Sequence, residues 1–137
     1  MKIREVMTAN PITLDSQTPV MQAAQAMREN DIGDVVVRYD GQLCGIVTDR
    51  DIVVRVLAAG KDPNATRLES VCSHDMLTIS PDQDASDAIR LMRERAIRRL
   101  PVVENNNLLG IVSLGDLAMA LDPHSTLGDI SAASPSH

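Results

Sequence analysis

The chain has 137 residues, of which 44% are hydrophobic, and this suits one compact domain or two small intimate halves. Tyr39 is the single aromatic residue, so the core must be aliphatic and methionine-rich. The net charge of −6 and the scarcity of aromatic residues argue against nucleic-acid binding, which needs a basic surface and stacking platforms. No apolar run could span a membrane and no signal-peptide pattern is present, so we expect a cytoplasmic protein without a membrane partner.

The first predicted elements are a short strand and an amphipathic helix. Residues 12–14 are expected to form a short extended segment after a proline. Thr18 is the expected N-cap of the helix and Pro19 its first residue, because proline loses no hydrogen bond at that position. The apolar residues of the helix recur at the spacing of one helical face, at Val20, Ala23, Ala24 and Met27.

A β-hairpin and a second helix are expected next. Apolar runs at 35–37 and 43–48 flank the dipeptide 40–41, Asp-Gly, which favours a tight turn between two strands. A closing helix is expected over residues 49–59. It should end at Gly60, since glycine readily adopts the left-handed conformation that terminates many helices.

The second half of the chain has the same series of elements. Residues 61–65 form a link, and the capping-box pattern from Thr66 to Glu69 predicts a short helix after it. A tail rich in Ser, Ala and Pro at 123–137 is expected to be mobile. The other elements are expected as a helix after Asp84 with the apolar face Ala85, Ala88, Ile89 and Met92, a hairpin of strands 100–103 and 108–113 with its turn at 105–107, and a closing helix over 114–121, near Pro123.

The two halves match without a gap over residues 6–56 when the chain is offset by 65 positions, which aligns Val6 with Val71 and Met27 with Met92. Such a long period indicates a duplicated supersecondary unit. We expect an α/β (α+β) fold of two βαββα units, packed through their sheets about a pseudo-twofold axis, because one such unit has too small a core to be stable alone. The expected division is 1–62, 63–122 and the tail 123–137.

One motif recurs at the same place in both copies. Gly45-Ile46-Val47-Thr48-Asp49-Arg50-Asp51 returns as Gly110-Ile111-Val112-Ser113-Leu114-Gly115-Asp116. The hydroxyl residue and the Asp three positions later suit an N-cap and its capping-box partner. A hydroxyl and free N–H groups at a helix start also suit a phosphate, and a nearby carboxylate suits ribose hydroxyls.

These residues resemble a tandem pair of CBS (cystathionine-beta-synthase) domains, also called a Bateman module. The resemblance covers nearly everything except the tail. It implies a regulatory module, with no required cofactor, that senses an adenosine-containing ligand such as AMP, ADP, ATP, S-adenosylmethionine, NAD or a cyclic dinucleotide, and that pairs into a homodimer. The matching segments are 6–8, 10–14, 32–33 and 45–52 in the first copy, and 97–103 and 110–113 with Asp116 in the second.

The resemblance also assigns roles by position. Asp51 and Asp116 would accept hydrogen bonds from ribose hydroxyls, while Thr48 and Ser113 would contact phosphate and Arg50 would add positive charge. Aliphatic side chains and backbone amides would flank each adenine. The first site would comprise Ile12, Thr13, Val35, Val36, Thr48, Arg50 and Asp51, and the second Leu77, Thr78, Arg98, Arg99, Leu100, Pro101, Ser113 and Asp116.

The two copies differ in charge, so we expect unequal sites. The second copy has Leu114-Gly115 in place of Asp49-Arg50, and it has Arg98-Arg99 in place of Gly33-Asp34. The family often has a proline where the first copy has Val36 and the second has Pro101. We expect the first site to prefer a ligand with little net negative charge, such as AMP or S-adenosylmethionine.

Other interpretations stay open. Capping alone also explains the repeated motif, so the chain is alternatively an interaction or structural module whose nucleotide sites have decayed. No catalytic constellation is evident, and an enzyme is not predicted; a separate, unidentified regulated protein is an expected partner. The two cysteines suit reduced thiols, because disulfides are rare in the cytosol. A metal site is not predicted, because no standard zinc spacing links Cys44, Cys72, His74, His124 and His137.

Overall fold

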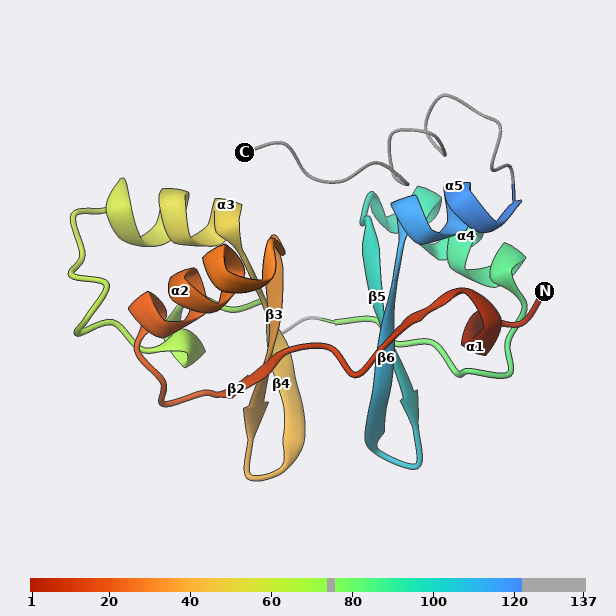
Figure 1. Cartoon of the computed structure of the whole chain (residues 1–137), viewed down its shortest axis with the longest axis horizontal. Coiled ribbons are helices and arrows are strands. Elements are labelled where there is room, and N and C mark those ends of the chain that lie inside the picture. Colours follow the sequence, from red (N-terminus) through yellow and green to blue (C-terminus); the bar gives the residue numbers. More distant parts are fainter. Residues whose placement is uncertain (74–75, 122–137) are drawn as a thin grey trace. The chain divides into compact units, whose positions relative to one another are not determined.

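The computed structural model describes residues 1–73 and 76–121 (Figure 1). Two compact units divide the chain. The central unit is Ile12–Met76, and the terminal unit combines Met1–Pro11 with the chain from Leu77 onward. Each unit contains one three-stranded sheet and its own apolar core. The expected tail at 123–137 and the three histidines lie outside the described residues.

The central unit has the expected βαββα order. Its sheet has the strand order β2-β3-β4, with β2 parallel to β3 and β3 antiparallel to β4. The helix α2 and the helix formed by α3 and η1 cover the same face of the sheet (Figure 1). In chain order its elements are β2 (Thr13–Asp15), α2 (Val20–Asn30), β3 (Asp34–Tyr39), β4 (Gln42–Thr48), α3 (Asp49–Ile52), the π-helical η1 (Val53–Leu57) and the 3-10 turn η2 (Leu68–Ser70).

The core of the central unit lies between that face and the helices. The apolar face predicted for α2 is present: Val20 and Ala23 are fully buried and Met27 is nearly so. Alternate sheet residues meet them, because successive side chains of a strand point to opposite faces. The buried sheet and helix partners are Val35, Val37, Val47, Ile52, Val56, Leu68, Val71 and Cys72.

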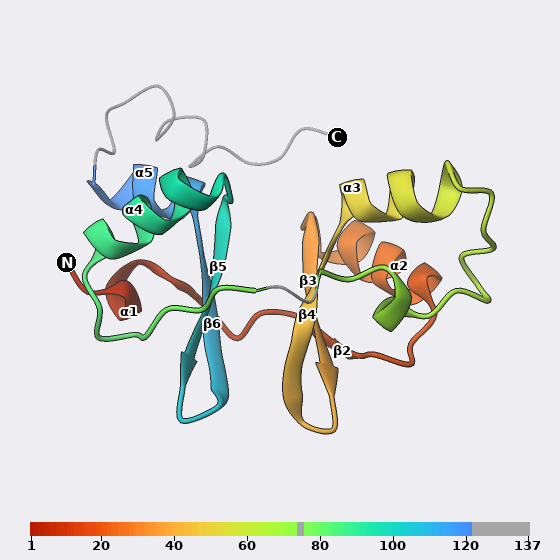
Figure 2. The same cartoon turned by 180° about the vertical axis from the view of Figure 1, so that it is seen from behind.

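The terminal unit has an equivalent hairpin with two helices, but its third strand pairs with the second hairpin strand and not with the first. Its elements are α1 (Ile3–Val6), β1 (Thr8–Ala9), α4 (Ala85–Arg95), β5 (Arg99–Glu104), β6 (Asn107–Ser113) and α5 (Leu114–Leu121). The sheet order is β1-β6-β5, with both pairs antiparallel. Figure 2 shows α4 and α5 on one face of this sheet.

Pro101 explains why the counterpart of β2 is reduced in the terminal unit. In the central unit the Val36 N–H donates to the Ile12 carbonyl (2.9 Å) at the start of the parallel pair. Pro101 occupies the position of Val36 and has no N–H to donate. In the terminal unit the counterpart of β2 is therefore reduced to a single parallel bridge between Ile79 and Val102.

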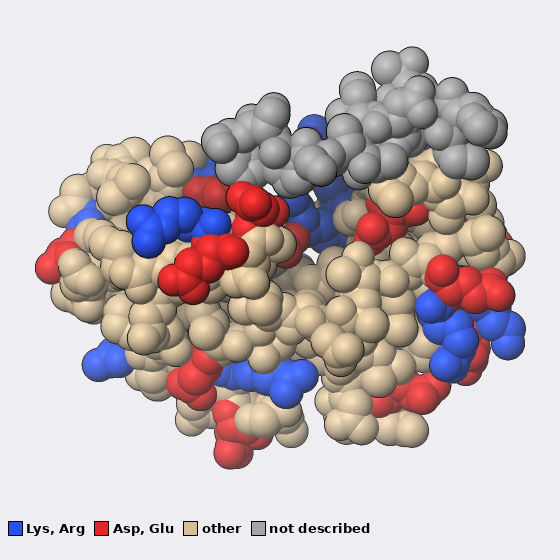
Figure 3. All heavy atoms as spheres, in the orientation of Figure 1, with Lys and Arg blue, Asp and Glu red and all other residues tan. Residues whose placement is uncertain are grey.

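The N-terminal segment belongs to the terminal unit, although it was expected with residues 12–62. Ile3 is fully buried in that unit's core, and its N–H donates to the Gln83 carbonyl (2.9 Å). Arg4 forms an ion pair with Asp82 at 2.8 Å. Basic and acidic side chains adjoin over α1 (Figure 3). The compact units therefore differ from the two sequence repeats.

The segment that precedes Leu77 belongs to the central unit, although it was expected with the second repeat. The Leu68 N–H donates to the Thr18 carbonyl (3.0 Å), and the Val20 N–H donates to the Thr66 carbonyl (2.8 Å). Leu68 is fully buried in the central core. Residues 63–76, expected with the second unit, therefore complete the first.

Two local predictions on helix starts were wrong. The helix α2 has Pro19, not Thr18, at its N-cap, because Pro19 is still extended and the Thr18 carbonyl accepts a hydrogen bond from the Leu68 N–H. The Thr66–Glu69 capping box is not formed; the Thr66 hydroxyl donates to the Asp62 carbonyl (2.8 Å) instead. The helix expected over 49–59 is α3 followed by one π-helical turn, and Gly60 follows it in the predicted left-handed conformation (φ 73°), where the Lys61 N–H donates to the Val56 carbonyl (2.9 Å).

Candidate functional site

The repeated motif forms a capping box at the start of α3. The Asp51 N–H donates to the Thr48 hydroxyl (3.1 Å), and the Thr48 N–H donates to the Asp51 carboxylate (2.9 Å). Thr48 is the N-cap and the last residue of β4. Both local hydrogen bonds follow from the three-residue spacing, so the motif has a structural role whatever else it binds.

The Asp51 carboxylate has a second partner that the sequence analysis did not name. The Arg55 guanidinium lies 3.7 Å from the oxygen that does not serve in the box. The Asp51 side chain is only 15% exposed, while that of Arg55 is 52% exposed. A ligand that bonds to this oxygen would compete with Arg55 or share the carboxylate with it. The four-residue separation was a signal for this ion pair.

Acidic groups surround the first helix start. Asp34 pairs in register with Thr48 across β3 and β4. The Asp49 carboxylate accepts a hydrogen bond from the Arg50 N–H (2.8 Å) and lies over Gly33, where an added Cβ would come within 3.3 Å of it. Arg50 itself is exposed. The three carboxylates at 34, 49 and 51 outnumber the nearby arginines and disfavour a multiply charged phosphate group.

The four residues expected to flank the first base divide between two environments. Ile12 and Thr13 lie beside Val36, through the Ile12 carbonyl and the β2–β3 register. The Val35 side chain fills the central core, so only its main-chain groups are available to a ligand. Val36 lies on the opposite sheet face and pairs with Ile46, a residue that sequence reasoning missed.

The second motif has the same box and an added hydroxyl. The Asp116 N–H donates to the Ser113 hydroxyl (3.0 Å), and the Ser113 N–H donates to the Asp116 carboxylate (3.0 Å). The Thr8 hydroxyl lies 3.4 Å from both carboxylate oxygens of Asp116. Thr8 was not predicted, and no local pattern could have found it, because it belongs to the other sequence repeat.

Basic residues replace the acidic ones beside the second motif. Arg99 pairs in register with Ser113, and the Arg98 carbonyl accepts a hydrogen bond from the Leu114 N–H (2.9 Å). The Arg98 side chain is exposed and that of Arg99 is half-buried. The structure thus brings both arginines to the same end of the sheet as the capping box.

The other four residues predicted for the second site each have a different environment. Leu100 is fully buried in the terminal core, so its side chain cannot flank a base. Pro101 pairs with Ile111 on the opposite face of the sheet. Leu77 is half-buried against the terminal core and Thr78 is exposed.

Both cysteines lie in the central unit as thiols, and neither is part of a disulfide. Cys44 is half-buried on β4, and Cys72 is buried in the core. Within residues 1–73 and 76–121, no group of three or more His, Cys, Asp or Glu side chains gathers as metal ligands would. Across the same residues, no helix has the length and apolar character that crossing a membrane requires.

Comparisons with known proteins identify the repeat. The CBS domain model matches residues 3–58 and 68–123. The CBS domain-containing protein YhcV of Bacillus subtilis is 38% identical over 117 residues, which are 85% of this chain and 83% of that protein. Hypoxic response protein 1 of Mycobacterium tuberculosis is 33% identical over 130 residues, covering 94% and 91% of the two chains.

Solved structures show the same fold. A putative signal-transduction protein with CBS domains from Burkholderia ambifaria superposes with a TM-score of 0.82 at 27% identity, covering 92% of this chain and 97% of that one. A hexameric CBS-CP12 protein from bloom-forming cyanobacteria gives a TM-score of 0.79 at 30% identity, covering 90% and 72%. The chain belongs to the CBS domain family, and it contains a tandem pair of CBS domains.

Proposed function

We propose that this CBS pair is a stand-alone regulatory module that senses an adenosine-containing ligand. CBS-domain pairs are usually regulatory and ligand-binding. The observation that carries the proposal is the carboxylate placed at the start of both α3 and α5, each with one oxygen left for a partner beyond its capping box. The sensor is non-enzymatic and cytoplasmic in this proposal, and it acts on a separate protein.

In the first site, Asp51 would accept hydrogen bonds from the two ribose hydroxyls. Displacing Arg55 from Asp51 would free its guanidinium for a phosphate, together with the exposed Arg50. The Val36 and Ile46 side chains and the main chain at Ile12 would hold the adenine. The carboxylates at 34, 49 and 51 support a ligand of low net negative charge, AMP or S-adenosylmethionine.

In the second site, Asp116 would hold the ribose and Thr8 would support its carboxylate. Arg98 and Arg99 would supply the positive charge that the first site lacks. Arginine suits this role because its planar guanidinium matches phosphate oxygens in a bidentate geometry. The second site would therefore accept ADP or ATP more readily than the first.

Calorimetry with AMP, ATP and S-adenosylmethionine tests the proposal. Asp51→Asn keeps an oxygen for the Thr48 N–H but removes the charge that a ribose would meet. It should weaken first-site binding by about 1.5–3 kcal/mol, or roughly ten- to a hundredfold. The matched control is Asp49→Asn, which removes an exposed neighbouring charge and should leave AMP binding intact or slightly stronger.

If none of these compounds binds the parent at millimolar concentration, the adenosine proposal fails. Unchanged binding by a folded Asp51→Asn variant would show that the carboxylate is a helix cap only. Thermal shift provides an independent reading, since a bound ligand at a hundredfold excess over Kd adds about 2.7 kcal/mol of stability.

A second candidate function is an interaction module without a nucleotide. Exposed apolar residues on η1 and the engagement of Asp51 by Arg55 favour it. Val53, Val54 and Leu57 are 55%, 46% and 57% exposed, respectively. We propose that a second copy of the chain covers them in a homodimer; the hexameric CBS-CP12 structure shows that a related protein assembles. If the protein binds an adenosine-containing ligand but stays monomeric, the sensor function is favoured over the interaction function.

A further inference from the structure

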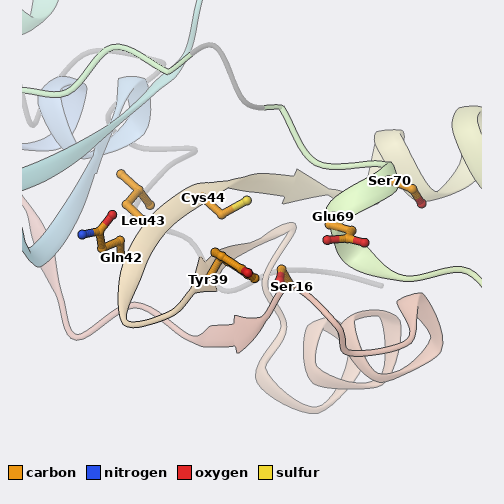
Figure 4. Close-up of a pocket in the computed structure, with 7 residues that line it drawn as sticks. All are labelled: Ser16, Tyr39, Gln42, Leu43, Cys44, Glu69 and Ser70. Atoms are coloured by element: carbon orange, nitrogen blue, oxygen red, sulfur yellow. The ribbon is translucent and has the colours of Figure 1, made fainter.

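Cys44 occupies a bulge in β4 beside an open pocket. The β3–β4 register shifts between Val37 and Arg38, so Cys44 is an extra residue between Leu43 and Gly45. Its side chain lines a pocket of about 570 Å³, and Figure 4 shows its sulfur on the side of Glu69 and Ser70. The pocket gives a small molecule access to this thiol. Its lining residues are Ser16, Tyr39, Gln42, Leu43, Cys44, Glu69 and Ser70.

Cys72 is buried in the central core and is protected from solvent. It is 4% exposed, its sulfur lies 3.1 Å from the position that a Cβ on Gly45 would take, and the Cys44 side chain, one residue away, packs against the same core. The main chain brings the two together, because Ser73 forms an antiparallel bridge with Ile46 and donates to its carbonyl (3.1 Å). The chain therefore places one accessible thiol and one buried thiol close together.

We propose that Cys44 and Cys72 form a thiol–disulfide exchange site, in which Cys44 attacks a small cationic disulfide in the pocket and Cys72 then displaces the bound group. Glu69 supplies the charge preference, since it is the charged residue among those that line the pocket. Its carboxylate accepts a hydrogen bond from the Gln17 amide (2.8 Å) and is thereby held in place. An anionic disulfide would meet this carboxylate and the net charge of −6.

The exchange balances in two steps. Cys44 first releases its proton to solvent, and its thiolate attacks one sulfur of R–S–S–R; the R–S–S–R bond breaks, Cys44–S–S–R forms, and R–S⁻ leaves and takes up a proton. Cys72 then releases its proton and attacks the Cys44 sulfur, which forms the Cys44–Cys72 bond and expels the second R–S⁻. The two cysteines are oxidised and one disulfide is reduced to two thiols.

The second step should be the slower one at neutral pH. Burial, followed by the charge and the hydrogen bond of Cys44, raises the pKa of Cys72 to about 12, with a smaller effect of Asp51 in the same direction. The groups that face Cys72 are Cys44 from β4, Asp51 from α3 and the Glu69 carbonyl, while Arg55 bonds to the adjacent Val71 carbonyl (3.2 Å). In the mixed disulfide Cys44 no longer carries a thiol, but burial, the largest cause, still raises the pKa of Cys72. Because only the thiolate attacks, the mixed disulfide should accumulate and then resolve faster as pH rises.

Mass spectrometry of the reduced protein during reaction with cystamine tests the proposal. The parent should first gain one cysteamine group at Cys44, then lose it as the internal disulfide forms, faster at pH 9 than at pH 7. Cys72→Ala should stop at the mixed disulfide, and Cys44→Ser should not react on the same timescale. Circular dichroism checks that each variant is folded.

Glu69→Gln tests the charge preference without removing the pocket. The parent should react faster with cystamine than with the anionic reagent 5,5′-dithiobis(2-nitrobenzoate) after correction for their rates with a free thiol. The substitution should reduce that ratio by about threefold or more, as expected for one charge at short range in water.

Three results would overturn the proposal. Reaction of Cys72 in folded Cys44→Ser at the parental rate would remove Cys44 from the attacking role. A mixed disulfide that never resolves in the parent, even at pH 9, would remove Cys72 from the resolving role. If the ratio of the two reaction rates were the same in the parent and in Glu69→Gln, the proposed preference for a cationic disulfide would be wrong.

Discussion

The Thr8 hydroxyl lies 3.4 Å from both oxygens of the Asp116 carboxylate, although 108 positions separate the two residues in the chain. Thr8 reaches Asp116 because β1 pairs with β6, where Thr8 is in register with Ile111. The first repeat thus contributes a residue to the capping box of the second. The arrangement differs from that at Asp51, whose partner outside the box is Arg55 from its own repeat.

Removing the Thr8 hydroxyl should cost little stability, and its effect on the free energy of unfolding should depend on whether Asp116 is present. We expect Thr8→Val to lower the free energy of unfolding by less than about 1 kcal/mol, since the contact is long and exposed. Asp116→Ala also loses a cap and should cost about 0.5–2 kcal/mol. Urea titrations of both variants and of the double variant measure the coupling. Strict additivity would show that the contact is not made in solution.

The two equivalent core methionines should contribute equally to stability. Met27 and Met92 are 7% and 6% exposed, each on the inner face of its helix. Replacing either by alanine leaves a cavity and should cost about 2–5 kcal/mol in a denaturant titration. Met119→Ala is the matched control, because Met119 is 40% exposed and should change stability by no more than about 0.5 kcal/mol. A loss near zero at Met27 or Met92 would contradict the packing described.

Asp84 should make stability depend on pH in the acid range. Hydrogen bonds from the Ser86 hydroxyl (2.6 Å) and N–H (3.0 Å) lower the pKa of Asp84 from 3.8 to about 2, with help from the N-terminal ammonium. A carboxyl whose pKa is lower in the folded state stabilises that state when ionised. The contribution is therefore present above about pH 4 and is lost as pH falls through about 2.

Asp84→Asn isolates this effect, because its amide oxygen still accepts from the Ser86 N–H. Urea midpoints between pH 5 and pH 2 should fall more steeply for the parent than for the variant. Parallel curves for the two proteins would show that the folded-state pKa is close to its ordinary value.

The exposed apolar residues of η1 predict self-association. Light scattering should give the mass of a dimer at micromolar concentration, and Leu57→Lys should shift the protein toward the monomer by placing a charge in the covered surface. Gln25→Lys is the control, since it adds the same charge at an exposed position of α2. A monomer mass for the parent protein would contradict the prediction. A hexamer mass would show self-association but would contradict the proposed dimer.

Sequence alone determined the features that depend on local spacing or on periodicity. The capping boxes at Thr48 and Ser113 were predictable because their hydrogen bonds join residues three positions apart. The hairpin turns were predictable because Asp40-Gly41 and Asn105-Asn106 suit the positive φ values that both turns adopt. The inner faces of α2 and α4 followed from helical spacing. The offset repeat established that two such units exist.

Only the tertiary structure decided which unit each connecting segment completes. Two equivalent repeats offer two equivalent places for a lead-in segment, so sequence equivalence could not assign Ile3 to one core and Leu68 to the other. Alternation along β3 likewise shows that Val35 and Val36 point in opposite directions, but packing against α2 decides that Val35 is the one in the core. The proximity of Cys44 to Cys72 has the same origin: it depends on the bulge in β4 and on the bridge between Ile46 and Ser73, and neither arises from local spacing.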